Sequence, residues 1–276
     1  MTGDNGWNDV SGDSHGTSIA AIIAGSGKGA VTGLAPDAKV LPVRVTVSGG
    51  AQPVTLAEGI LYAVDHGAKV VNVSSGTDTP DPNLKAAVEH ALAKDVVVVA
   101  AAGNDGRRGN APIYPASFPG VVAVTGVDAH NACWSDSESG PQIALAAPGV
   151  DITSADDHGG YLRGDGTSYA APYVAAAAAL VRSEYPRMTA GQVVRQLVDT
   201  ADRVGSAPHD DHFGYGIVDP LRAVTAGPTT DSGLPTATVA VGPWINWPLW
   251  GGVAGVVAVL AAAAVLVRRK QSRGKA

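Results

Sequence analysis

The chain has 276 residues, of which 45% are hydrophobic and only 5% aromatic, so its length suits one medium-sized domain with an appendage. The formal net charge is −6, but residues 268–276 carry +5, and the acidic remainder argues against nucleic acid as a partner. The single cysteine, Cys133, excludes an internal disulfide, and no Cys/His cluster with ligand spacing predicts a metal or another cofactor.

Predicted helices and strands alternate from residue 15 to about residue 225. Asp95–Ala101 contains four consecutive valines, which are typical of a strand buried on both faces. Buried strands that alternate with helices predict an α/β fold, in which a parallel sheet carries helices on both faces. The other strands are expected at Ala38–Val47, Lys69–Ser74, Val121–Val127 and Ile143–Ala146, and the helices at Ser14–Ala24, around Leu56, Ile60 and Val64 up to Gly67, and at Leu84–Ala93, Thr167–Glu184 and Thr189–Ala201.

The C-terminal part of the chain differs in composition from this main domain, which we place at residues 1–225. Pro, Thr, Gly and Ser predominate at residues 226–242 and predict a linker. Residues 249–267 are then almost entirely Val, Ala, Leu and Gly, and 19 helical residues at about 1.5 Å each match one hydrocarbon core. A transmembrane helix is therefore expected at residues 243–267, with a buried core helix as the alternative.

The flanks of this apolar run indicate its orientation. Three tryptophans lie at its front edge, as in an interfacial aromatic belt, and the basic residues 268–276 follow it. The positive-inside rule then predicts a single-pass protein of the cell membrane, with a cytoplasmic C-terminus and the main domain outside. The tryptophans are Trp244, Trp247 and Trp250.

Three short motifs carry candidate chemistry. Ser168, in Gly-Thr-Ser-Tyr-Ala-Ala-Pro, opens an Ala-rich helix whose dipole and free N–H groups favour a nucleophile and its oxyanion; a plain N-cap is the alternative. His15, in Asp-Ser-His-Gly-Thr-Ser, also starts a helix and suits a general base, with a surface histidine as the alternative. Asn104 follows the valine strand, so its amide is either an oxyanion donor at the sheet edge or part of an ordinary Gly-Asn turn.

In this order, His-Gly-Thr, Ala-Gly-Asn and Gly-Thr-Ser-x-Ala-x-Pro resemble the subtilisin-like serine peptidases over residues 4–225. The resemblance implies hydrolysis of protein or peptide substrates, with Ser168 as nucleophile, His15 as general base and Asn104 as oxyanion donor. It further implies a cis Tyr114–Pro115 bond, a substrate-binding strand end at Ser74, Ser75 and Gly76, and a specificity pocket walled by Ala101, Ala102 and Gly103.

The C-terminal linker, apolar span and basic tail resemble the mycosins, membrane-anchored subtilases of type VII secretion, and imply secretion machinery as a partner. The family's triad aspartate follows an apolar strand, and none of Asp4, Asp9 and Asp13 matches that setting. The first residues also lack the basic and apolar regions of a signal peptide. We therefore expect an N-terminally truncated peptidase, nearly inactive as written.

Two other functions are alternatives to this interpretation. The first is a membrane-tethered scaffold that binds a partner chain in the same cleft without cutting it. The second, an α/β-hydrolase esterase, fits poorly, because Ser168 lies in no Gly-x-Ser-x-Gly elbow and the candidate histidine precedes the serine.

Overall fold

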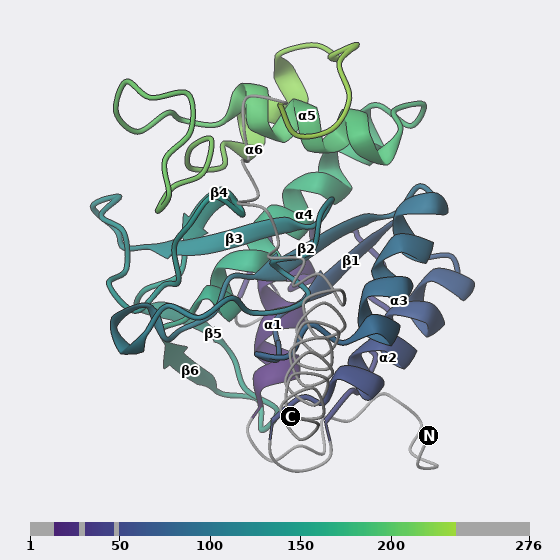
Figure 1. The fold of residues 1–276 in the computed structure, drawn as a ribbon, viewed down its shortest axis with the longest axis vertical. Helices are drawn as coiled ribbons and strands as arrows, with labels where there is room; N and C mark the ends of the chain where they lie inside the picture. Colours follow the sequence, from purple (N-terminus) through teal and green to yellow (C-terminus); the bar gives the residue numbers. More distant parts are fainter. Residues whose placement is uncertain (1–13, 28–30, 47–49, 236–276) are drawn as a thin grey trace, which may run out of the picture. The chain divides into compact units, whose positions relative to one another are not determined.

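The structure, a computed structural model, describes residues 14–27, 31–46 and 50–235 (Figure 1). Its central element is a four-stranded parallel sheet in the order β1-β2-β3-β4, which confirms the predicted fold class. Each strand lies within two residues of its expected bounds. The strands are β1 (Val70–Val73), β2 (Val97–Ala101), β3 (Val122–Val127) and β4 (Ile143–Pro148).

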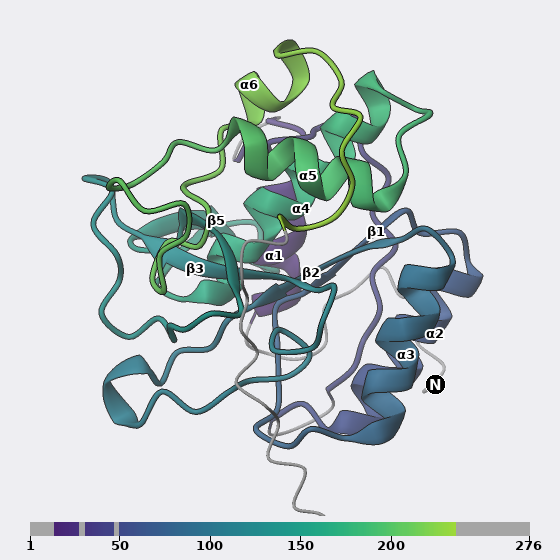
Figure 2. The ribbon, with the colours of Figure 1, turned by 45° about the horizontal axis from the view of Figure 1, so that its top comes forward.

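Helices cover both faces of this sheet (Figures 1 and 2). The side chains of β2 divide between the two faces. Val97 and Val99 belong to one core cluster, Val98 and Ala100 to another, as the alternation of side chains along a strand requires. The first cluster packs under α4 (Thr167–Glu184) and α5 (Ala190–Thr200), and the second under α2 (Pro53–Asp65) and α3 (Pro82–Ala93).

Local sequence explains how α4 packs on the sheet and where α5 begins. Helix α4 contacts all four strands, because its buried face consists mostly of alanine and lets the backbone approach the sheet closely. Helix α5 begins after Thr189, whose hydroxyl accepts from the backbone N–H of Gln192 in a complete capping box. The expected N-cap is thereby confirmed.

The strand expected at Ala38–Val47 is wrong for the residues described there. Residues 38–46 form no strand, and β1 is the outermost strand on its side of the described sheet. A strand exists only through its ladder, so an apolar alternating sequence without a paired neighbour stays irregular. Val43 and Val45 pack against Gly59 of α2 instead, while Val40 and Leu41 are exposed.

A small antiparallel hairpin that the sequence pattern did not predict anchors the first helix. Strands β5 (Ile152–Ala155) and β6 (Tyr161–Gly164) pair with each other, and β5 contacts α1 (His15–Ala24). The Ser18 hydroxyl donates to the carbonyl of Ala155 at 2.8 Å, and the Ser154 hydroxyl donates to the carbonyl of Ser18 at 2.8 Å. These bonds fix the position of α1.

The main domain ends in a short helix, α6 (Pro220–Thr225), which contacts α4 and α5. Within the described ranges, no helix has both the length and the apolar character needed to cross a bilayer. The transmembrane helix and the basic tail expected at residues 243–276 lie outside the described residues, as does the end of the linker.

Candidate active site

Ser168 occupies the first turn of α4, at the edge of the sheet where the parallel strands end. Its side chain is half-buried, and the N–H groups of a first helical turn have no acceptor within the helix. The hydroxyl of Ser74, just after β1, donates to the Ser168 carbonyl at 2.7 Å and so ties the strand end to the helix start. This environment favours negative charge near the Ser168 hydroxyl.

Two hydrogen bonds from Thr167 fix the orientation of the Asn104 side-chain amide. The Thr167 backbone N–H donates to Asn104 Oδ1 at 3.0 Å, and the Thr167 hydroxyl donates to the same oxygen at 2.9 Å. Because a backbone N–H can only donate, the amide oxygen must face Thr167 and the NH₂ group must face away from it. The buried Thr167 was not among the residues predicted from sequence, although it lies in the same motif as Ser168.

The free side of the Asn104 amide points toward Ser168. A β-carbon built on Gly166 would lie 3.1 Å from Ser168 Oγ and 3.5 Å from Asn104 Nδ2, so both groups approach the same side of Gly166. The backbone nitrogen of Ser168 lies 3.6 Å from the same β-carbon position. A hydroxyl nucleophile and two N–H donors around one small space can together hold a carbonyl carbon and its oxygen.

His15 is brought to the same region by helix packing. Helix α1 contacts α4, and the His15 ring meets the ring of Tyr169 edge-on, with centroids 5.9 Å apart. Tyr169 is the residue after Ser168, so the His15 ring lies beside the first turn of α4. Ser14 is also held in place, because its hydroxyl donates to the Asp157 carboxylate in the turn between β5 and β6.

The residues expected to bind substrate lie at the ends of two neighbouring strands. Val73 of β1 is opposite Ala100 of β2, so Gly76 and Gly103, three residues further on, follow parallel strand ends. Both glycines and Ser75 are half-buried, whereas Ala101 and Ala102 are buried in the core. Any pocket between the strand ends is therefore walled at its mouth by the glycines.

The chain matches the model of one known protein family. A family model described as the subtilase family matches residues 2–216. The chain belongs to the subtilase family. It is a subtilisin-like serine endopeptidase, and its substrates are proteins.

Among curated subtilases, subtilisin DY of Bacillus licheniformis is 38% identical over 212 residues, which cover 75% of this chain and 76% of subtilisin DY. Subtilisin E of Bacillus subtilis (strain 168) is 38% identical over 211 residues, which cover 75% of this chain and 55% of subtilisin E. The family match at residues 2–216 spans the sheet and the helices that carry the candidate site.

Solved structures of proteases share the fold. MycP1 without its N-terminal propeptide matches with a TM-score of 0.74 at 30% identity, over 84% of each chain. The MycP3 protease from the type VII (ESX-3) secretion system matches with 0.67 at 32% identity, over 78% of this chain and 73% of MycP3. The patellamide maturation protease PatA matches with 0.70 at 33% identity, over 78% and 84%.

One feature that the resemblance implied is confirmed in this subtilase, and the acids that precede His15 lie beyond the described residues. The Tyr114–Pro115 bond is cis, as the resemblance implied. Asp4, Asp9 and Asp13, the acids that precede His15, fall within residues 1–13, which the structure does not describe.

Beside the candidate site, this subtilase buries a carboxyl group that sequence inspection missed. Glu138 is only 1% exposed, and neither of its carboxyl oxygens has a hydrogen-bond partner. Its backbone N–H donates to the Gly103 carbonyl at 3.1 Å, and a β-carbon built on Gly103 would lie 2.7 Å from Glu138 Oε1. Burial, together with the negative charge of Asp105, raises the pKa of Glu138 from 4.5 to about 7.

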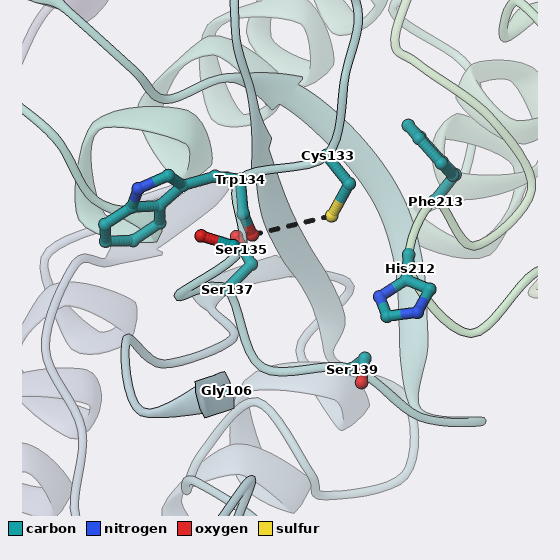
Figure 3. Close-up of a pocket in the computed structure, with 8 residues that line it drawn as sticks. All are labelled: Gly106, Cys133, Trp134, Ser135, Ser137, Ser139, His212 and Phe213. Carbon is teal, nitrogen blue, oxygen red and sulfur yellow. Dashed lines mark hydrogen bonds between the residues drawn. The ribbon is translucent and has the colours of Figure 1, made fainter. Parts of the chain in front are cut away.

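The residues on either side of Glu138 face a different space. Ser137 and Ser139 line a pocket of about 190 Å³, into which Cys133 and His212 also point (Figure 3). Burial and the charge of Asp210 raise the pKa of the Cys133 thiol, which makes it a poor nucleophile. The pocket is separate from the side of Gly166 that the Ser168 and Asn104 side chains approach, and the Glu138 carboxyl faces the Gly103 side.

The raised pKa of Glu138 predicts a pH-dependent stability. The unfolded chain releases this proton near pH 4.5 and the folded chain near pH 7, so the folded state binds more protons between these values. We therefore expect the free energy of unfolding to fall as pH rises through that window, by about 3 kcal/mol at most. Urea unfolding of wild type and Glu138→Gln, measured from pH 4 to 8, checks this.

The Glu138→Gln variant should lose this fall of the unfolding free energy with pH, because glutamine does not titrate. Glu58→Gln, which changes an exposed glutamate on α2, is the matched control and should keep it. An equal slope in wild type and Glu138→Gln would contradict the assignment.

Proposed function

We propose that this subtilase cuts peptide bonds through Ser168 as nucleophile, His15 as general base and Asn104 as oxyanion donor. The observation that carries the proposal is the approach of the Ser168 hydroxyl and the Asn104 amide to the same side of Gly166. A substrate carbonyl placed next to Gly166 would meet the Ser168 hydroxyl on one side and N–H donors on the other. No metal or cofactor is needed for such acyl transfer.

The proposed reaction has two halves. His15 takes the proton of Ser168 as the hydroxyl attacks the carbonyl carbon, and the resulting oxyanion is bound by Asn104 Nδ2 and the Ser168 N–H. His15 then gives the proton to the leaving amine, and water releases the acyl group by the same path in reverse. Thr167 serves as a positioning residue, because it holds the Asn104 amide with its NH₂ group toward the carbonyl.

The extended substrate is proposed to lie along the end of β1. β1 is an outer strand of the described sheet, and Ser74, Ser75 and Gly76 continue it toward Ser168. A peptide that adds as a strand there binds through backbone hydrogen bonds, which suit a protein substrate of varied sequence.

Digestion of an unfolded protein tests the peptidase function against the scaffold alternative. We expect the chain to cut a denatured protein such as casein at internal bonds, with new N-termini identified by mass spectrometry, and the Ser168→Ala variant to produce none. Capture of the denatured protein without any cleavage, by wild type and variant alike, would instead support a peptide-binding scaffold.

We further propose that the chain is a mycosin-like, secretion-associated peptidase of the cell membrane, with its catalytic domain outside and its C-terminus in the cytoplasm. The 19-residue apolar run at 249–267 and the basic tail after it support this, as do the structural similarities to MycP1 and MycP3. Secretion machinery is then an expected partner.

Membrane fractionation tests the anchor. Wild type should stay in the pellet after a sodium carbonate wash, whereas a variant with Val257→Asp and Leu260→Arg should appear in the supernatant, because charges near the middle of a span oppose insertion. Release of the wild type by carbonate would contradict the anchor while leaving the peptidase function untouched.

A further inference from the structure

The two strand ends at the candidate site enclose a space between Gly76 and Gly103. The two glycines occupy equivalent positions three residues after the paired residues Val73 and Ala100. One strand end is tied to Ser168 through the Ser74 hydroxyl, and the other leads directly into Asn104. A residue whose carbonyl lies between Ser168 and Asn104 must therefore place its own side chain between these strand ends.

That space is already filled by a side chain of the protein itself. A β-carbon built on Gly76 would collide with Cγ2 of Ile113, and one built on Gly103 would lie 2.7 Å from Cγ1 of Ile113. The Ile113 side chain thus reaches from one glycine to the other. A residue larger than glycine at either position would have no room.

Backbone hydrogen bonds hold Ile113 in place. The Tyr114 N–H donates to the Thr77 carbonyl at 2.8 Å, and the Thr77 N–H donates to the Tyr114 carbonyl at 2.9 Å. The Ile113 carbonyl itself accepts from the Ser117 N–H at 2.9 Å. Because Ile113 is followed by this double bridge to the chain just after Gly76, its backbone is fixed beside the space, which the side chain can leave only by rotation about its own bonds.

We infer that Ile113 limits the residue before the scissile bond, P1, to a small side chain such as that of glycine, alanine or serine. The inference rests on the proposed function, since it needs the scissile carbonyl to lie between Ser168 and Asn104. A branched or aromatic P1 side chain would have to occupy the volume that Ile113 already takes, and close-packed interiors do not tolerate such overlap.

The buried Glu138 allows a second, independent test of this inference. Its Oε1 and Cγ1 of Ile113 lie at the same distance, 2.7 Å, from the β-carbon position of Gly103, so the carboxyl borders the space that Ile113 fills. Removing the isoleucine side chain should open the space toward an acidic wall. Such a wall favours a basic P1 side chain once the carboxyl is ionised, which requires a pH above its pKa of about 7.

The experiment compares kcat/KM at pH 9 for three peptides that differ only in an Ala, Phe or Lys at P1. Wild type should cut the Ala peptide at least tenfold faster than the other two. Ile113→Ala should raise the Phe and Lys values at least tenfold, and adding Glu138→Gln should remove the Lys gain but keep the Phe gain. Leu61→Ala on α2, the same kind of truncation away from the site, should change none of the ratios.

Equal cleavage of the Ala and Phe peptides by wild type would overturn the inference, and so would unchanged ratios in Ile113→Ala. If Ile113→Ala does not fold, Ile113→Ser keeps a single γ atom and should still shift the Phe-to-Ala ratio upward. Labelling of Ser168 by a fluorophosphonate probe separates the two proposals. Labelling with an unmoved P1 profile rejects only the inference, whereas no labelling of wild type rejects the proposed function.

Discussion

Replacement of Ser168 by alanine is expected to lower peptide hydrolysis by about 10²-fold, to the limit of detection. In subtilisin, loss of the whole triad costs about 10⁶-fold and loss of its aspartate alone about 10⁴-fold, so a chain in which no aspartate matches the triad acid has about 10²-fold left to lose with its serine. The hydroxyl is the only part of residue 168 that the variant lacks, and no acyl-enzyme can form without it. Steady-state hydrolysis of a peptide with alanine at P1 measures the change.

A matched variant shows whether the loss of hydrolysis is specific to Ser168. Ser135→Ala changes an exposed serine in the loop between β3 and β4 and should hydrolyse the peptide at the wild-type rate. Far-ultraviolet circular dichroism should show the same helix content in both variants. If Ser168→Ala retained even a tenth of the wild-type rate, Ser168 would not be the nucleophile.

Replacement of Asn104 by aspartate is expected to lower kcat by about 10²–10³-fold with KM nearly unchanged. Aspartate preserves the oxygen that accepts two hydrogen bonds from Thr167, so the positioning contacts survive. It replaces the NH₂ donor with an oxygen that repels a developing oxyanion. The loss should therefore fall on the transition state and not on substrate binding.

The control for the added charge is Asn83→Asp, in the exposed first turn of α3. It introduces the same carboxylate away from the site and should leave kcat unchanged. A rise in KM with constant kcat in Asn104→Asp would mean that Asn104 binds the ground state only, and would contradict its role as oxyanion donor.

Local patterns were enough to predict the regular core. The Ala-rich run predicted a helix at Thr167–Glu184, and α4 has these bounds, because small side chains with helix propensity agree with the packing that the sheet demands. The four valines likewise predicted β2, since a strand buried on both faces has no polar positions. Thr189 marked the start of α5 through its own side chain.

Features that depend on distant neighbours could not be predicted in this way. Residues 38–46 have a strand-like sequence, but strand formation depends on a ladder partner that the sequence of the segment does not specify. Glu138 and Ile113 come from separate loops and meet only because both pack against Gly103. The orienting contact between Thr167 and Asn104 joins positions 63 residues apart. Such contacts are consequences of tertiary packing.

The central claim is that His15, Asn104 and Ser168 act on one carbonyl, and covalent labelling tests it most directly. The full chain is treated with a fluorophosphonate probe, and the modified peptide is identified by mass spectrometry. We predict a single adduct, on Ser168, and a labelling rate about 10²–10⁴-fold lower in His15→Ala. An adduct on another serine, or equally fast labelling of His15→Ala, would contradict the account.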